Sequence, residues 1–200
     1  MELAELVRQI SGEEARSFLL GILEENEHYA NVFRNTYGPF DMKAALEALD
    51  QEIQQAVWRN SNRGFIDYRH ASQFGRDWNW ALADAVIPLI ERRKLDAVVA
   101  LTLQAWRSVW SVEMDDSDGT TSDMNYTVLY YWDNILKLAD FEAERNLITA
   151  VCGFLTNPPT RDVEREAFSY QAYEAKEFLL KRFGNDARHA DLLAGLRTKG

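Results

Sequence analysis

Cysteine, proline and long apolar segments are scarce in this chain. A single cysteine, Cys152, among 200 residues excludes an intrachain disulfide framework and a zinc site built from several cysteines. No apolar run reaches the roughly 18 residues of a membrane span, and Glu2 and Glu5 lie where a secretory signal would carry basic residues. These absences predict a soluble cytoplasmic protein that does not associate with membranes.

Basic residues are outnumbered by acidic ones, 22 against 32, which gives a net charge of −10. This charge argues against binding of nucleic acid or an anionic membrane over the whole surface. The distribution is uneven, because residues 59–107 hold 8 basic and 5 acidic residues, a local net charge of +3. The central segment therefore stands out from an acidic background.

Only four prolines and ten glycines interrupt the chain, and the apolar residues between them recur with the spacing of a helix. No bounded stretch alternates as a strand does. The expected helices cover residues 13–37, 42–57, 67–89, 95–112, 126–138, 143–155, 160–183 and 186–196. The sequence therefore predicts an all-α fold of about 8–9 helices.

Polar residues ahead of the apolar runs predict where several helices start. Ser11 and Glu14 have the spacing of a capping box. Asp41, Asp123 and Thr160 stand where an N-cap is expected, since a short polar side chain there accepts a hydrogen bond from a free backbone N–H.

The expected helices pair as antiparallel hairpins that begin near residues 13, 68, 123 and 161. Their unequal lengths predict an irregular stack, similar to TPR or HEAT arrays, in which residues 1–200 form one domain. The segment Tyr126–Leu138 is apolar nearly all round. We expect the other helices to enclose it.

The acidic loop Asp115–Gly119 has some features of a calcium-binding loop. An EF-hand with Gly119 at loop position 6 would place Met114 at position 1 and Asn125 at position 12, where oxygen ligands and a bidentate glutamate are required. The EF-hand pattern therefore fails, and the favoured interpretation is a polar turn ahead of a helix. Weak cation binding by this loop stays open.

Each of the three histidines follows a carboxylate by three residues, in the pairs Glu25 and His28, Asp67 and His70, and Asp186 and His189. Pairs of this spacing share a helix face and build di-iron sites in helical bundles. Asp67 and Asp186, however, stand near expected helix starts, where an aspartate serves as a cap. We therefore expect no metal and no cofactor, and a metal-binding bundle remains an alternative.

Residues for covalent catalysis are few. Cys152 lies in the apolar run Ile148–Phe154, a setting that raises the pKa of a thiol and makes it inert. The sequence contains no nucleophile elbow, no glycine-rich phosphate loop and no His-Glu-x-x-His motif. The chain is therefore expected not to be an enzyme.

Arginines and aromatic residues lie close together in the central segment. The predicted contact surface consists of Arg59, Arg63, Arg69, Arg76, Trp78, Trp80, Arg92, Arg93 and Lys94. Such a surface binds a protein partner, and nucleic acid is the less favoured alternative. These side chains could instead pack between helices and pair with acidic residues of a neighbouring hairpin.

The stretch Arg63–Arg69, which reads Arg-Gly-Phe-Ile-Asp-Tyr-Arg, and the later Asp-Asp-Ser-Asp-Gly turn at 115–119 resemble a helical region of bacterial SWIM-type zinc finger proteins. The likeness covers roughly residues 13–155, and it implies a TPR- or HEAT-like interaction scaffold. It also implies that Gly64 permits a tight turn, that Phe65 and Tyr68 wedge between hairpins, and that Asp67 caps a helix.

The zinc finger of that family needs a Cys-x-Cys pair and a Cys-x-His pair. This chain has only Cys152, followed by Gly153, so no zinc ligand can be carried over. The predicted function is a non-enzymatic scaffold that binds another macromolecule, most readily a protein.

Overall fold

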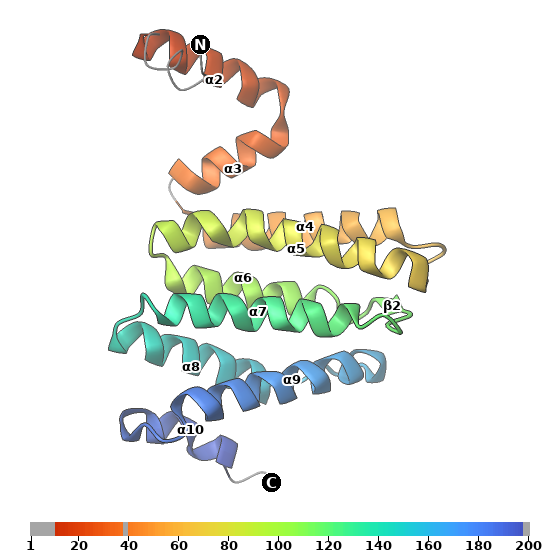
Figure 1. The fold of residues 1–200 in the computed structure, drawn as a ribbon, viewed down its shortest axis with the longest axis vertical. Coiled ribbons are helices and arrows are strands. Elements are labelled where there is room, and N and C mark those ends of the chain that lie inside the picture. The colour runs from red at the N-terminus through yellow and green to blue at the C-terminus, as the bar shows by residue number, and fades with distance from the viewer. Residues whose placement is uncertain (1–10, 38–39, 198–200) are drawn as a thin grey trace. The chain divides into compact units, whose positions relative to one another are not determined.

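The computed structural model describes residues 11–37 and 40–197, and they form the all-α fold that the sequence predicts (Figure 1). The helices in these ranges are α2 (Gly12–Glu25), α3 (Glu27–Tyr37), α4 (Met42–Asn60), α5 (Tyr68–Glu91), α6 (Leu95–Arg107), α7 (Thr120–Leu136), α8 (Phe141–Thr156), α9 (Asp162–Phe183) and α10 (Ala190–Arg197). A short 3-10 helix, η1 (Ala187–His189), precedes α10. The prediction of a stacked helical array is thereby confirmed.

Side-chain caps start several helices where the sequence predicts them. The Ser11 hydroxyl accepts the Glu14 N–H at 3.2 Å, and the Glu14 carboxylate accepts the Ser11 N–H at 2.9 Å, which completes the capping box. Asp41 accepts the Ala44 N–H at 3.1 Å at the start of α4. Polar residues therefore define these boundaries through hydrogen bonds to backbone groups that a helix leaves free.

Two predicted caps are wrong. Helix α7 begins after Gly119, whose φ of +80° forms the turn, so Asp123 lies within the first turn of the helix and not before it. Helix α9 begins after Arg161 and has no side-chain cap there, so Thr160 does not serve as one. The left-handed turn at Gly119 therefore sets the start of α7.

The chain divides into two compact units, residues 1–40 and residues 41–200. The first contains α2 and α3, which pack against each other. The single helix expected over residues 13–37 is broken at Asn26, because the Asn26 side chain accepts the Tyr29 N–H at 3.1 Å and so starts a new helix. The expected pairing of this segment with the 42–57 helix stays a prediction. That residues 1–200 act as one domain stays a prediction.

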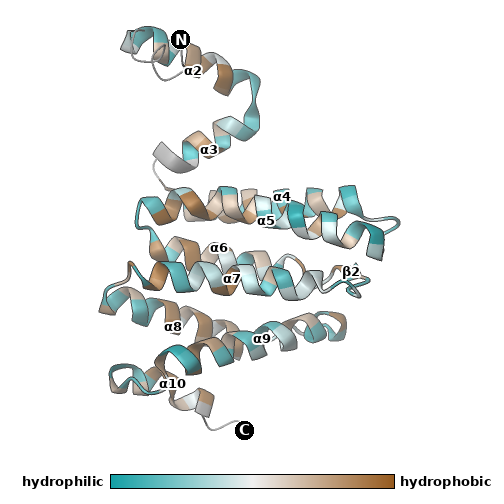
Figure 2. Cartoon of the chain, viewed as in Figure 1, coloured by the Kyte–Doolittle hydropathy of each residue, from teal (hydrophilic) through white to brown (hydrophobic). Residues whose placement is uncertain are grey.

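The second unit is a stack of two layers. Helices α4, α6, α8 and α10 contact one another in order and form the first layer, and α5, α7 and α9 form the second (Figure 1). Figure 2 shows hydrophobic residues along most of α6 and α8, whereas α9 is largely hydrophilic. The first layer thus supplies much of the core, and the second presents one side to solvent.

Three tryptophans from successive helices form the centre of the core. Trp78 of α5, Trp106 of α6 and Trp132 of α7 are fully buried. The Trp132 indole N–H donates to the Thr102 hydroxyl at 2.8 Å, which satisfies a polar group inside the core. The Trp106 and Trp132 rings meet edge to face with centroids 5.2 Å apart. These contacts fix the layers against each other.

Two short strands, β1 (Phe65–Ile66) and β2 (Glu113–Met114), pair in parallel, with Phe65 opposite Glu113. The Asp115 N–H continues the pairing by donating to the Ile66 carbonyl at 2.9 Å. Strands of two residues carry no alternating pattern, so periodicity could not predict them. The two turns that carry the family resemblance therefore lie side by side.

The resemblance implies roles for the first of these turns, and the structure agrees with some of them. Gly64 has a φ of +89°, which an L side chain rarely adopts, and Asp67 accepts the Arg69 N–H at 2.9 Å as the cap of α5. The wedge role of Phe65 and Tyr68 is wrong, because their side chains are 45% and 56% exposed. Ile66, fully buried between them, packs into the stack instead.

Candidate functional site

The predicted contact residues lie on or around α5. Trp78 does not belong to a surface, because it is fully buried and its indole N–H donates to the Ala105 carbonyl at 3.3 Å. Trp80 is 75% exposed. Residues two apart on a helix point about 200° from each other, so only one of these tryptophans could face solvent.

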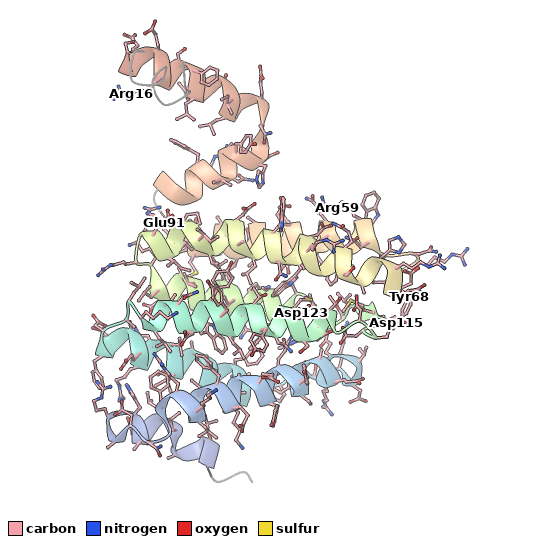
Figure 3. The ribbon with its side chains drawn as sticks, viewed as in Figure 1. Arg16, Arg59, Tyr68, Glu91, Asp115 and Asp123 are labelled. Atoms are coloured by element: carbon pink, nitrogen blue, oxygen red, sulfur yellow. The ribbon has the colours of Figure 1, made fainter. Side chains whose placement is uncertain are left out.

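The predicted basic residues other than Arg76 fall at the two ends of α5. Arg69 stands in its first turn, whereas Arg92, Arg93 and Lys94 follow its last residue, Glu91. At about 1.5 Å of rise per residue, roughly 34 Å separates Arg69 from Arg92. Figure 3 shows Tyr68 and Asp115 at one end of the stack and Glu91 at the other. The structure therefore does not bring all predicted residues together.

Arg59, Arg63 and Arg69 surround the turn between α4 and α5, and all three are exposed. In the described residues, none of the three forms an ion pair. The Arg69 guanidinium lies 5.7 Å from the centre of the Tyr68 ring, a cation–π distance. This basic end of the hairpin lies beside the acidic loop, because β1 pairs with β2.

The acidic loop uses its carboxylates on its own backbone. Asp116 accepts the Thr121 N–H at 2.7 Å, and Asp118 accepts the Thr120 N–H at 3.1 Å. Across the described residues, no three His, Cys, Asp or Glu side chains gather closely enough to hold a metal ion. The loop therefore serves as the start of α7 in this structure.

The exposed residues of α5 form one stripe along the helix. Gln73, Arg76, Trp80, Asp84 and Ile87 are exposed and recur every three or four residues, so they share one side. The Arg76 guanidinium donates to the Gln73 side-chain oxygen at 2.8 Å and lies one turn before Trp80. Arg76 and Trp80 are thus the predicted residues that stand together on the free side of α5.

Tyrosines line the corresponding stripes of the next two helices in the layer. Tyr126 and Tyr130 of α7 are 76% and 62% exposed, so the expectation that this segment is enclosed on all sides is wrong. Within residues 41–197, the exposed tyrosines lie on the side of the second layer that faces away from the first layer. On α9, Tyr170 and Tyr173 are also exposed.

Contacts beneath the surface fix the register of α5 against α7. A Cβ at Gly75 of α5 would lie 2.8 Å from the Thr120 methyl of α7, so these two positions face each other. Trp80 follows Gly75 by five residues, and Tyr126 follows Thr120 by six. Because α5 and α7 run in the same direction (Figure 1), Trp80 and Tyr126 lie at nearly the same level.

The register of α9 follows in the same way. The Trp132 ring of α7 lies 5.6 Å from the Phe178 ring of α9. Tyr126 precedes Trp132 by six residues, and Tyr173 precedes Phe178 by five. Trp80, Tyr126 and Tyr173 therefore form a line across three helices, which we call the aromatic row.

Each residue of the aromatic row has an exposed carboxylate one helical turn away on its own helix. Asp84 follows Trp80 by four residues, Asp123 precedes Tyr126 by three, and Glu177 follows Tyr173 by four. Residues at these spacings lie on the same side of a helix. Arg76 and Lys176 also lie one turn from Trp80 and Tyr173, so the surface around the row carries both charges, with exposed carboxylates in excess.

Sequence reasoning missed Tyr126, Tyr130, Tyr170 and Tyr173. A signal was present in α7, because the apolar residues Val128, Trp132 and Ile135 recur on one side, and the two tyrosines fall opposite them. The phenol tolerates both water and burial, so hydrophobicity alone placed these tyrosines in the core.

The carboxylate–histidine pairs do not build a common site. His70 lies in the first turn of α5, where its imidazole hydrogen-bonds the Asp67 carboxylate at 2.8 Å and thereby lowers the pKa of Asp67. His189 is buried near the C-terminal end and contacts the Glu144 carboxylate at 3.1 Å. The two pairs belong to different ends of the stack, and each stabilises a local turn.

Cys152 lines an apolar cavity of about 480 Å³ between α8, α9 and α10. Burial raises the pKa of its thiol, and its Sγ lies 3.7 Å from the Leu192 carbonyl. The chemistry of this side chain is therefore that of a packing residue.

The described residues 41–197 thus form an all-α array of two helical layers with an exposed aromatic row on the second layer. None of the described helices is long and apolar enough to cross a membrane. Comparison with family models, curated proteins and solved structures gives no match.

Proposed function

We propose that this chain is a non-enzymatic scaffold that binds another protein through the outer side of α5, α7 and α9. The aromatic row carries the proposal. Its members are 75%, 76% and 61% exposed, although large aromatic side chains gain most by leaving water. Tyrosine and tryptophan are also the residues that dominate the binding energy of protein interfaces.

The arrangement of the row suits a surface shared by successive helices. Helical arrays bind partners across several repeats rather than at one loop. Arg76 extends the surface along α5, and Arg69 extends it further toward the α4–α5 turn. The resemblance to the helical region of SWIM-type proteins points to the same class of function, and it stays a prediction.

Nucleic acid is a weaker candidate for this surface. Asp84, Asp123 and Glu177 flank the row and would repel phosphates at close range, and the net charge of −10 adds to the repulsion. The uncompensated arginines around the α4–α5 turn lie at one end of the stack and not beside the row's centre. A protein partner therefore suits this surface better than nucleic acid does.

A capture experiment with matched variants tests the proposal. The bait is the full chain, its Trp80→Ala, Tyr126→Ala, Tyr173→Ala triple variant, or a Trp58→Ala control. Trp58 lies on α4, is 80% exposed, and stands outside the row. Proteins captured from nuclease-treated extract are measured by quantitative mass spectrometry, with circular dichroism to confirm that each bait is folded.

We expect the triple variant to lose about tenfold or more of the bound partner, since hot-spot aromatics each contribute more than about 1 kcal/mol. The Trp58→Ala control should keep it. Equal capture by all three baits would reject the surface. Capture that nuclease abolishes would move the function to nucleic acid.

A further inference from the structure

The spacing of the aromatic row has a counterpart in one peptide conformation. Packed helices lie about 8–10 Å apart, and Trp80, Tyr126 and Tyr173 stand at one level on successive packed helices. A polyproline II helix repeats every three residues over about 9.3 Å. Every third side chain of such a segment would therefore meet the next aromatic ring.

Other peptide conformations fit the row less well. An extended strand brings side chains back to one face about every 6.6–6.8 Å, so its contacts lose register after one interval. An α-helix advances about 5.4 Å per turn, and its apolar side also needs a hydrophobic groove. The row is a line of separate rings between polar residues, which suits a narrow and extended ligand.

The charges around the row restrict the class of ligand further. One exposed carboxylate accompanies each ring, at Asp84, Asp123 and Glu177. Asp84 and Glu177 lie on one side of the row and Asp123 on the other, so a basic ligand would be attracted from both sides, whereas an acidic ligand would be repelled. Because every third side chain of a polyproline II helix points the same way, a lysine in each repeat matches Asp84 and Glu177, which lie on the same side of the row.

We propose that the aromatic row binds a basic, proline-rich protein segment in the polyproline II conformation, with one proline ring on each aromatic residue. This inference rests on the proposed function and names the partner's chemistry. Proline rings pack on flat aromatic side chains, and the segment is already extended before binding, so little chain entropy is lost. Tyrosine hydroxyls and the Trp80 indole N–H are available to donate to its free carbonyls.

Synthetic peptides with a fluorescent label test this inference on the full chain by fluorescence anisotropy. The probe is a twelve-residue peptide of four Pro-Ala-Lys repeats. Three control peptides are compared with it. The first has the same composition but places the prolines out of the three-residue period, the second has glycine in place of proline, and the third has glutamate in place of lysine. Circular dichroism of each peptide verifies its conformation.

The periodic basic peptide should bind. The affinity of each comparison peptide should be lower by about tenfold or more, because each loses a stacking or charge contribution in every repeat. Trp80→Ala should weaken the periodic peptide by a similar factor, while Trp58→Ala should leave it unchanged. The combined Asp84→Asn, Asp123→Asn, Glu177→Gln variant should remove the preference for lysine over glutamate.

Two results would overturn the inference. One is equal binding of the periodic and shuffled peptides, and the other is binding that survives Trp80→Ala. If no peptide binds while the capture experiment still depends on the row, the proposed scaffold function stands and the polyproline ligand is rejected. If neither depends on the row, both proposals fail together.

Discussion

At the scale of single residues, Gly75 decides how closely α5 approaches α7. A Cβ there would lie 2.8 Å from the methyl of Thr120, which is itself buried. An added methyl therefore has to displace a packed, branched side chain and not a mobile one. The absence of a side chain at Gly75 also sets the register that aligns Trp80 with Tyr126.

Gly75→Ala should accordingly be less stable than Gly153→Ala. Both substitutions gain the helix preference of alanine over glycine, but nothing lies within 4 Å of a Cβ at Gly153. The difference in the free energy of unfolding should equal the cost of overpacking, about 1–3 kcal/mol. Urea denaturation of the two variants measures it, and equal stabilities would show that α7 moves away without cost.

At the scale of elements, η1 and α10 dock onto α8 through a polar corner. The Arg188 guanidinium donates to the Asp186 carboxylate at 2.6 Å, and the same carboxylate caps η1 by accepting the Arg188 backbone N–H at 3.0 Å. These hydrogen bonds lower the pKa of Asp186 from 3.8 to about 2. Arg145 of α8 also contacts Asp191 at 2.8 Å, which ties α10 to the first layer.

Acid should weaken this corner in a defined window. Because the pKa of Asp186 is depressed in the folded chain, its stabilising effect is complete above the unfolded value near 3.8 and disappears as the pH falls through about 2. The melting temperature of the wild-type chain should therefore exceed that of Asp186→Asn at neutral pH. The two should converge as the pH drops from about 4 to about 2. A gap that does not change with pH would exclude the charge as its cause, since asparagine keeps the cap.

The elements that sequence reasoning predicted are those that local chemistry specifies. The caps at Ser11, Asp41 and Asp67 lie within three residues of the groups they bond, so the local pattern contains all the information. The pairing of Ile66 with Met114 joins segments far apart in the chain, and no local pattern reports it. The break at Asn26 was not predicted for another reason, because the helical spacing of apolar residues continues across it.

At the scale of the whole molecule, the aromatic row depends on stacking rather than on any one segment. Its members are separated by 46 and 47 residues in the sequence, and only the parallel course of α5, α7 and α9 brings them to one level. Composition directed attention to Trp80 because arginines surround it. Tyr126 and Tyr173 lie in segments without such a bias. The helical pattern alone could place Tyr126 on the exposed side of α7, but its alignment with Trp80 and Tyr173 depends on the packing of three helices.

The division into two units leads to a final prediction about the whole chain. Residues 41–200 contain Trp78, Trp106 and Trp132 in one core, and their first helix has its own cap at Asp41. Helix α2, in contrast, has no buried residue. A chain of about 40 residues rarely buries enough surface to fold alone.

A 41–200 fragment should therefore keep the circular dichroism signal per residue of a helical array and melt cooperatively, within about 5 °C of the full chain. A 1–40 peptide should be largely unfolded by circular dichroism. If the 41–200 fragment instead melts broadly or aggregates, the first 40 residues complete the core of the second unit, and the two units are one folding domain.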